Sequence, residues 1–159
     1  MAVGEVFTTV APGSIYHLNG NSTDSGSNAN NGTDTSMTYI AGKFGGCGSF
    51  DGSASKINIA TSFIGQTNVT FMAWVRTTDT TTQISIYSEG NTGNNDRYVQ
   101  INKTAANLLL LALSNDVPTT LDITSIRAFL TNTWNHVVIT KTGDNDWRVY
   151  LNGNLEKTD

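Results

Sequence analysis

The sequence contains little cysteine, histidine and charge, and each shortage excludes a class of protein. Cys47 is the only cysteine among 159 residues, which excludes an internal disulfide and the small secreted domains that depend on such bonds. Two histidines and one cysteine are also too few for a typical zinc site. The nine basic residues form no cluster and are outnumbered by thirteen acidic ones, so nucleic acid is not expected as a partner.

Long apolar runs are missing as well. The longest run, Leu108–Leu113, has the length of a strand and is far too short for a membrane span. The first residues have neither a basic start nor an apolar stretch, so no secretion signal is visible there. We therefore expect no membrane insertion, and an exported protein would need a signal upstream or another route out of the cell.

The composition is rich in residues that favour strands and tight turns. Threonine, asparagine, serine and 15 glycines replace apolar residues, which make up 38% of the chain. Lys56–Ala60 alternates apolar and polar residues, whereas Val69–Arg76 is apolar along most of its length, as in a central strand. Turn signals recur roughly every 8–12 residues. No helical period persists along the chain, so these patterns predict an antiparallel all-β protein.

The apolar residues of the expected central strands predict the core. Trp147 is assigned to it because it alternates in phase with two apolar residues of its strand. The predicted core, buried between two stacked sheets, contains Phe71, Val75, Val137 and Ile139 together with the indoles of Trp74, Trp134 and Trp147.

Several short motifs occur in a fixed order between residues 14 and 155. They are Leu18–Asn21, Asn30–Thr33, Gly42–Gly45, Ser49–Gly52, Phe71–Val75, Trp134–Thr140 and Tyr150–Gly153. In order and spacing these motifs resemble the laminin-G-like domains of the concanavalin A-like lectin/glucanase family. The resemblance implies an antiparallel two-sheet β-sandwich of jelly-roll type over residues 13–159, preceded by a lead-in strand or linker at residues 1–12.

The family pattern continues past the point where this sequence stops. After the Asn152-Gly153 turn the family has a further short strand and a closing strand, which usually pairs near the first strand. The resemblance therefore implies that the domain lacks its closing C-terminal strands and has an open sheet edge. We expect this chain to be a fragment, with the missing strands as its partner; the alternative is that another segment or a neighbouring subunit supplies them.

Carboxylates for glycoside hydrolysis are not arranged in a suitable pattern. Glycosidases of this fold commonly carry Glu-x-Asp-x-x-Glu on one strand, which supplies a nucleophile and an acid. The three glutamates here, Glu5, Glu89 and Glu156, are far apart, and Asp144 and Asp146 lie in an expected hairpin turn. The resemblance, with this motif absent, predicts a domain that is not an enzyme.

A sugar-binding site is predicted where aromatic side chains flank a polar loop. Aromatic rings can cover the apolar face of a sugar, and amides and carboxylates can bind its hydroxyl groups. One loop and its flanking strands bring such residues to one end of the sandwich. The predicted ligand-binding residues are Tyr87, Asn94, Asn95, Asp96, Arg97 and Tyr98.

A structural calcium ion is predicted in the long polar loop of residues 19–33. Calcium is bound by clustered oxygen atoms, and this loop offers those of Asp24, Asn28 and Asn31. Many relatives of the family carry such an ion at a sandwich edge. The alternative is a plain solvated loop, because no Asp-x-Asp-x-Asp-Gly spacing is present. No other cofactor is expected.

The resemblance predicts a non-catalytic recognition or adhesion module that binds a glycan or another surface polymer. Its expected location is outside a cell or on a virion surface, as in phage tail proteins. The alternative is a structural domain that packs against neighbouring subunits, and a polysaccharide-active enzyme is a third hypothesis. Saturable sugar binding would favour recognition, whereas assembly that depends on protein concentration would favour the structural role.

Overall fold

The computed structural model describes residues 1–9, 13–60, 62, 66–90, 98–114, 120–143 and 146–158. These ranges contain no helix that is long and apolar enough to cross a membrane. Their regular structure consists of strands, which are β1 (Ala2–Thr9), β2 (Ser14–Tyr16), β3 (Thr33–Thr35), β4 (Thr38–Ala41), β5 (Gly46–Ser49), β6 (Lys56–Asn58), β7 (Val69–Arg76), β8 (Ile84–Gly90), β9 (Tyr98–Lys103), β10 (Leu108–Ser114), β11 (Thr120–Ala128), β12 (Asn135–Thr142), β13 (Asp146–Leu151) and β14 (Asn154–Thr158).

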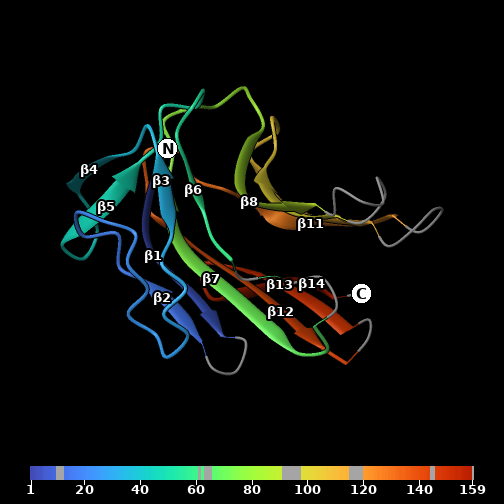
Figure 1. The fold of residues 1–159 in the computed structure, drawn as a ribbon. Helices are drawn as coiled ribbons and strands as arrows, with labels where there is room; N and C mark the ends of the chain where they lie inside the picture. Colours follow the sequence, from blue (N-terminus) through green and yellow to red (C-terminus); the bar gives the residue numbers. More distant parts are fainter. Residues whose placement is uncertain are drawn as a thin grey trace.

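All described strand pairs are antiparallel, and they form three sheets (Figure 1). The largest has the order β14-β13-β12-β7-β1-β5-β4, with β2 added beside β1. The second sheet has the order β11-β10-β9-β8 and lies over the β7 and β12–β14 half of the first. The third is the short β3–β6 ribbon, which runs close to β8 in Figure 1. The predicted all-β antiparallel fold is confirmed.

The core lies between the large sheet and the four-stranded sheet. Along β7 and β12 every second residue is buried, which is the period of a strand with one face inside. Phe71, Val75, Val137 and Ile139 are each no more than 1% exposed, as predicted. Burial of each large apolar side chain stabilises the fold by about 1.5–3 kcal/mol. The opposite sheet contributes Ile101, Leu109, Leu111 and Ile123.

Two of the three tryptophans predicted in the core are not part of it. Trp147 is 7% exposed and packs inside, as predicted. Trp74 and Trp134 are half-buried, and Trp74 occupies an outward position of β7 between the buried Ala73 and Val75. The prediction for Trp74 failed because Val69–Arg76 appeared apolar on both faces, whereas no sheet that the structure describes covers the outer face of β7.

Strand β1 is an internal strand of the large sheet. It pairs with β7 from Ala2↔Arg76 to Thr9↔Thr70, and on its other side with β2 and β5. The sequence suggested a lead-in strand or linker for residues 1–12 and an open edge near the first strand of the domain. In the structure β2 pairs with β1 through Val6↔Tyr16, so the N-terminal strand β1 supplies main-chain hydrogen-bond partners along this edge of β2. The closing strands beyond Asp159 stay a prediction.

Candidate functional site

A groove of about 420 Å³ opens between β6 and β8, and we call it the β6–β8 groove. Residues 55–59 of β6 and its flanks form one wall, and residues 85–89 of β8 form the other. The floor includes Tyr16, Leu18 and Phe71, which belong to the buried core. The volume lies within the range of about 300–1,000 Å³ that is usual for small-ligand sites.

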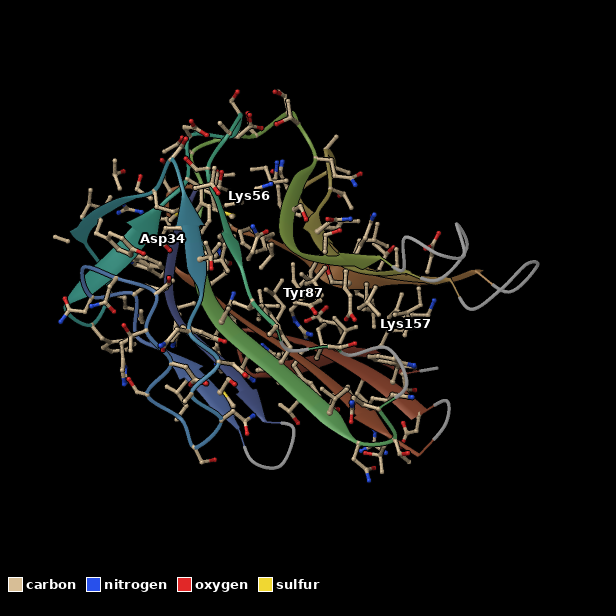
Figure 2. The ribbon with its side chains drawn as sticks, in the orientation of Figure 1. Asp34, Lys56, Tyr87 and Lys157 are labelled. Carbon is tan, nitrogen blue, oxygen red and sulfur yellow. The ribbon has the colours of Figure 1, made fainter. Side chains whose placement is uncertain are left out.

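A β-bulge in β8 aims two side chains into this groove. The register of β8 on β9 shifts between Ser85 and Tyr87, so that Tyr87 pairs with the fully buried Ile101. An extra residue in one strand reverses which face the following side chains occupy. Tyr87 and Glu89, two positions apart, therefore both face the space between the sheets, where Figure 2 shows Tyr87.

The Tyr87 phenol is held in place by a ring and a carboxylate. Its ring lies 5.7 Å from that of Phe71, centroid to centroid, and its hydroxyl donates a 2.9 Å hydrogen bond to Oε2 of Glu89. Burial raises the pKa of Tyr87 well above its ordinary value, and the negative charge of Glu89 and this hydrogen bond raise it further. The phenol therefore stays protonated and remains a donor across the physiological pH range. Ser62 donates to the other Glu89 oxygen, Oε1.

The opposite wall of the groove presents alternating apolar and polar side chains. Ile57 and Ile59 are half-buried toward the groove, whereas Lys56 and Asn58 are exposed at its rim (Figure 2 labels Lys56 on β6). The position of this wall depends on Gly32, because a Cβ atom there would lie 2.5 Å from Cγ2 of Ile57. The groove thus combines aromatic and aliphatic surface with a carboxylate, an ammonium group and an amide.

The structure brings one of the six predicted ligand-binding residues into the groove. That residue is Tyr87. Asn94, Asn95, Asp96 and Arg97 lie outside the described residues, and Tyr98 is described only in its backbone, which pairs with Gly90 and Ser114. Their role in ligand binding stays a prediction.

The three residues of the predicted calcium site share one loop that folds back on β2. Asp24 accepts hydrogen bonds from the backbone N–H groups of Ile15 and Gly26 at Oδ1, and of Asn30 at Oδ2. Asn31 Oδ1 accepts from the N–H of Asp24, at 3.0 Å. Both carboxylate oxygens are thus engaged by the backbone, so Asp24 organises the loop. A calcium ion at Asp24, Asn28 and Asn31 stays a prediction.

Packing and charge at this loop explain why Asp24 is fixed in place. A Cβ atom at Gly26 would lie 2.0 Å from the carbonyl oxygen of Gly13, so the loop can approach β2 only with glycine there. Burial raises the pKa of the Asp24 carboxyl, but hydrogen bonds from Ile15, Gly26, Ser14 and Asn30 outweigh it and hold the pKa below its ordinary value. The carboxylate is therefore the stable form in the folded loop.

The sequence interpretation missed Glu89 and the residues of β6 as groove residues. Glu89 was considered only as a catalytic carboxylate, although its spacing of two from Tyr87 places both on one face of a strand. Glu89 is the single carboxylate among the groove-lining residues that the structure describes. No cluster of three or more histidine, cysteine, aspartate or glutamate side chains suited to a metal ion occurs within the described ranges.

Comparison with known proteins agrees with the observed fold. A family model described as Laminin_G_3, concanavalin A-like lectin/glucanases superfamily, matches residues 51–159. No curated protein matches the sequence. Among solved structures, domain 4 of AbnA, a GH43 extracellular arabinanase from Geobacillus stearothermophilus in complex with arabinotriose, superimposes with a TM-score of 0.72.

This structural match extends over most of both chains. It covers 99% of this chain and 76% of the other, at 16% sequence identity, which is evidence for a common fold alone. The family model spans more than half of the sequence, including the β7 and β12–β14 strands that form the core. The chain therefore belongs to the concanavalin A-like lectin/glucanase superfamily.

Proposed function

We propose that this chain is a non-catalytic carbohydrate-recognition module that binds a short stretch of a glycan in the β6–β8 groove. The observation that carries the proposal is the Tyr87–Glu89 pair, in which a phenol packed on Phe71 is fixed by a 2.9 Å hydrogen bond inside a groove of about 420 Å³. A rigid ring next to a carboxylate acceptor suits a sugar, because the ring covers its apolar face and the carboxylate accepts hydrogen bonds from its hydroxyl groups.

Each part of the groove has a role in this proposal. The Tyr87 ring and the Ile57 and Ile59 side chains contact the C–H face of a sugar. The Glu89 carboxylate accepts hydrogen bonds from sugar hydroxyls, and Lys56 and Asn58 bind hydroxyls at the rim. Because the Tyr87 hydroxyl is already bonded to Glu89, the pair enters the complex preorganised, which lowers the entropic cost of binding.

The related structure supports a carbohydrate ligand and suggests which one to test first. Domain 4 of the Geobacillus arabinanase was solved with arabinotriose. Arabino-oligosaccharides are therefore the first probe for this chain, with xylo- and gluco-oligosaccharides of equal length for comparison. That arabinanase is extracellular, and we propose a location outside the cell for this chain as well. The virion surface stays a prediction that rests on the sequence.

Titration calorimetry with these oligosaccharides tests the proposal. We expect saturable binding by the wild-type chain, a loss of about fivefold in affinity for Tyr87→Phe, and a larger loss for Glu89→Gln. Tyr150→Phe is the matched control, because it removes a hydroxyl from a half-buried tyrosine of β13 that does not line the groove. If Tyr150→Phe weakens binding as much as Tyr87→Phe, the groove is not the site.

The assembly role predicted as the alternative is tested on the same samples. Sedimentation velocity over a range of protein concentrations measures self-association without any ligand. A chain that binds no oligosaccharide and assembles as its concentration rises would overturn the recognition proposal and favour a structural role.

A further inference from the structure

The outer face of the large sheet carries a cluster of aromatic and cationic side chains near the end of β7. The imidazole of His136 stacks on the indole of Trp74 with ring centroids 4.7 Å apart, and Phe44 meets the same indole edge-on at 5.9 Å. Phe44 is 57% exposed. We call this cluster the outer platform, and it consists of Lys43, Phe44, Trp74, Arg76, Trp134 and His136.

Strand register explains why these side chains meet. Trp74 and Arg76 face outward because their neighbours Ala73 and Val75 fill the core. His136 is the cross-strand partner of Trp74 on β12, and on the other side the partner is Gly4, which has no side chain. The turn between β4 and β5 then brings Lys43 and Phe44 over this part of the sheet.

Two cations of the platform have no carboxylate partner among the residues that the structure describes. The Lys43 ammonium lies 4.2 Å from the centroid of the Trp74 ring, and the Arg76 guanidinium lies 5.4 Å from that of Trp134. Within the described ranges, neither side chain forms an ion pair or a hydrogen bond. By contrast, Arg127, Arg148 and Lys103 each lie within 4 Å of a carboxylate. The platform therefore keeps two uncompensated positive charges beside exposed aromatic surface.

We infer that the outer platform is a second binding surface, which takes a carboxylate-bearing polysaccharide. Uronate carboxylates accept hydrogen bonds from Lys43 and Arg76, and a sugar ring packs on the exposed face of Phe44. The aromatic rings supply apolar contact, and the cations select acidic sugars over neutral ones. This surface is built from the outer face of β7 and β12, so it acts independently of the groove between the sheets.

An acidic sugar fits the platform better than a nucleic acid does. Nucleic acids are bound by surfaces that neutralise many phosphates at once, whereas the platform presents two cations, Lys43 and Arg76. Binding of single-stranded DNA is therefore an outcome that the experiment must include.

The experiment measures binding of the full chain to polygalacturonate, neutral arabinan and single-stranded DNA at two salt concentrations. We expect salt-sensitive binding to polygalacturonate, and a loss of about fivefold in Lys43→Gln/Arg76→Gln. Phe44→Ala should also weaken binding, and its exposed ring makes misfolding a minor concern. Lys157→Gln is the matched control, because Lys157 is an exposed cation on β14 outside the platform (Figure 2).

Three outcomes would overturn the inference. They are the absence of polygalacturonate binding, an equal loss in Lys157→Gln and in the double variant, and DNA binding as tight as polygalacturonate binding. Tyr87→Ala separates this surface from the groove. It should abolish binding of neutral oligosaccharides and leave polygalacturonate binding within about twofold of wild type. If Tyr87→Ala also removes polygalacturonate binding, both ligands use the groove and no second surface exists.

Discussion

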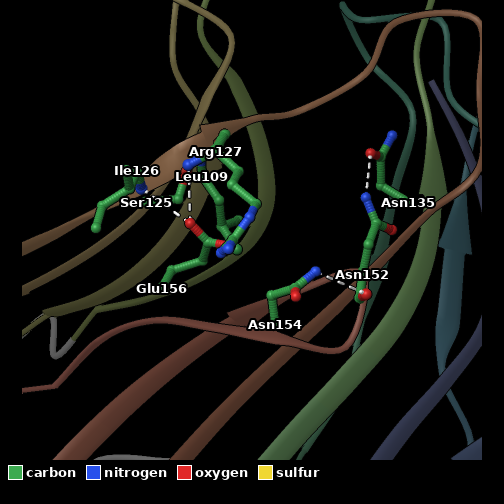
Figure 3. A network of polar contacts seen from close by, with 8 residues as sticks. All are labelled: Leu109, Ser125, Ile126, Arg127, Asn135, Asn152, Asn154 and Glu156. Carbon is green, nitrogen blue, oxygen red and sulfur yellow. Dashed lines mark hydrogen bonds and ion pairs between the residues drawn. The ribbon is translucent and has the colours of Figure 1, made fainter.

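The buried carboxylate of Glu156 on β14 forms a 2.9 Å ion pair with the guanidinium of Arg127 on β11, which joins the two main sheets (Figure 3). Oε2 of Glu156 also accepts hydrogen bonds from the backbone N–H groups of Ile126 and Arg127, at 3.0 and 2.8 Å. The Glu156 side chain is 0% exposed, whereas that of Arg127 is 57% exposed. One glutamate near the C-terminus thus anchors the end of the large sheet to the β8–β11 sheet.

We expect Glu156→Ala to lower the free energy of unfolding by about 2–4 kcal/mol, because two backbone N–H groups and a guanidinium lose their acceptor. Chemical denaturation followed by tryptophan fluorescence measures this change. Asp146→Ala is the control, because it breaks an exposed ion pair with Arg148 and should have no measurable effect. Equal losses in the two variants would mean that Glu156 does not join the sheets.

Acid should destabilise the protein through Glu156 and Asp24. Burial raises the pKa of Glu156, but hydrogen bonds from the backbone and guanidinium of Arg127 and from Ile126 hold it below 4.5. The pKa of Asp24 is likewise held below 3.8. Both carboxyls have a lower pKa in the folded state, so each stabilises the fold at pH values above its ordinary pKa. This contribution is lost as the pH falls toward the pKa of the folded state.

Melting midpoints recorded between pH 7 and pH 3 test this dependence. The midpoint of the wild-type chain should fall below about pH 4.5. Glu156→Gln should be less stable at pH 7 and should show a shallower decline toward acid. A decline of unchanged steepness in this variant would assign the acid sensitivity to other groups.

Strand β1 should be required for folding. Seven register pairs join it to β7, so deletion of residues 1–12 would expose the backbone edge of the strand at the centre of the core. We expect the shortened chain to aggregate or to lose its cooperative unfolding transition, as measured by circular dichroism. Addition of twelve polar residues to the N-terminus should leave the melting midpoint unchanged. An unaltered midpoint after the deletion would show that residues 1–12 are only a linker.

Asp24 should stabilise the loop that follows β2. We expect Asp24→Ala to lower the free energy of unfolding by about 2 kcal/mol, since three backbone N–H groups lose a charged acceptor. This loss should be the same with added calcium and with a chelator, whereas Asp122→Ala, at an exposed position of β11, should change little. A midpoint that rises with calcium in the wild-type chain, but not in Asp24→Ala, would instead establish the predicted metal site.

Local sequence patterns were sufficient for the core strands. Val137 and Ile139 of β12 were correctly placed inside; they lie two positions apart on one face of the strand, with His136 and Thr140 on the other face. Trp147 was placed in the core because it alternates in phase with Val149 and Leu151, and it is buried. The positive φ angles of Asn152 and Gly153 are those of a type I′ turn. By contrast, β7 is apolar on both faces, so its sequence could not show that Trp74 faces outward.

The candidate site depended on features that a sequence does not display. The bulge at Ser85–Tyr87 reverses the face on which Tyr87 lies, and nothing in the alternation of Gln83–Ser88 indicates it. Residues 56–59 form a wall of the groove only because the β3–β6 ribbon lies beside β8. Glu89 was visible as a carboxylate, but its partner Tyr87 became relevant only when both faced the same cavity.

The sequence by itself determined the all-β class, the family and the buried residues of the central strands, because these depend on short-range alternation and on turns of fixed composition. Only the tertiary structure decided which strand edges are paired and which side chains meet on the faces of the sheets. It placed β1 between β7 and β5, joined Glu156 to Arg127 across 29 residues of sequence, and set Trp74 beside Lys43. Such contacts join segments that are distant along the chain, and no local pattern specifies which distant segment will supply the partner.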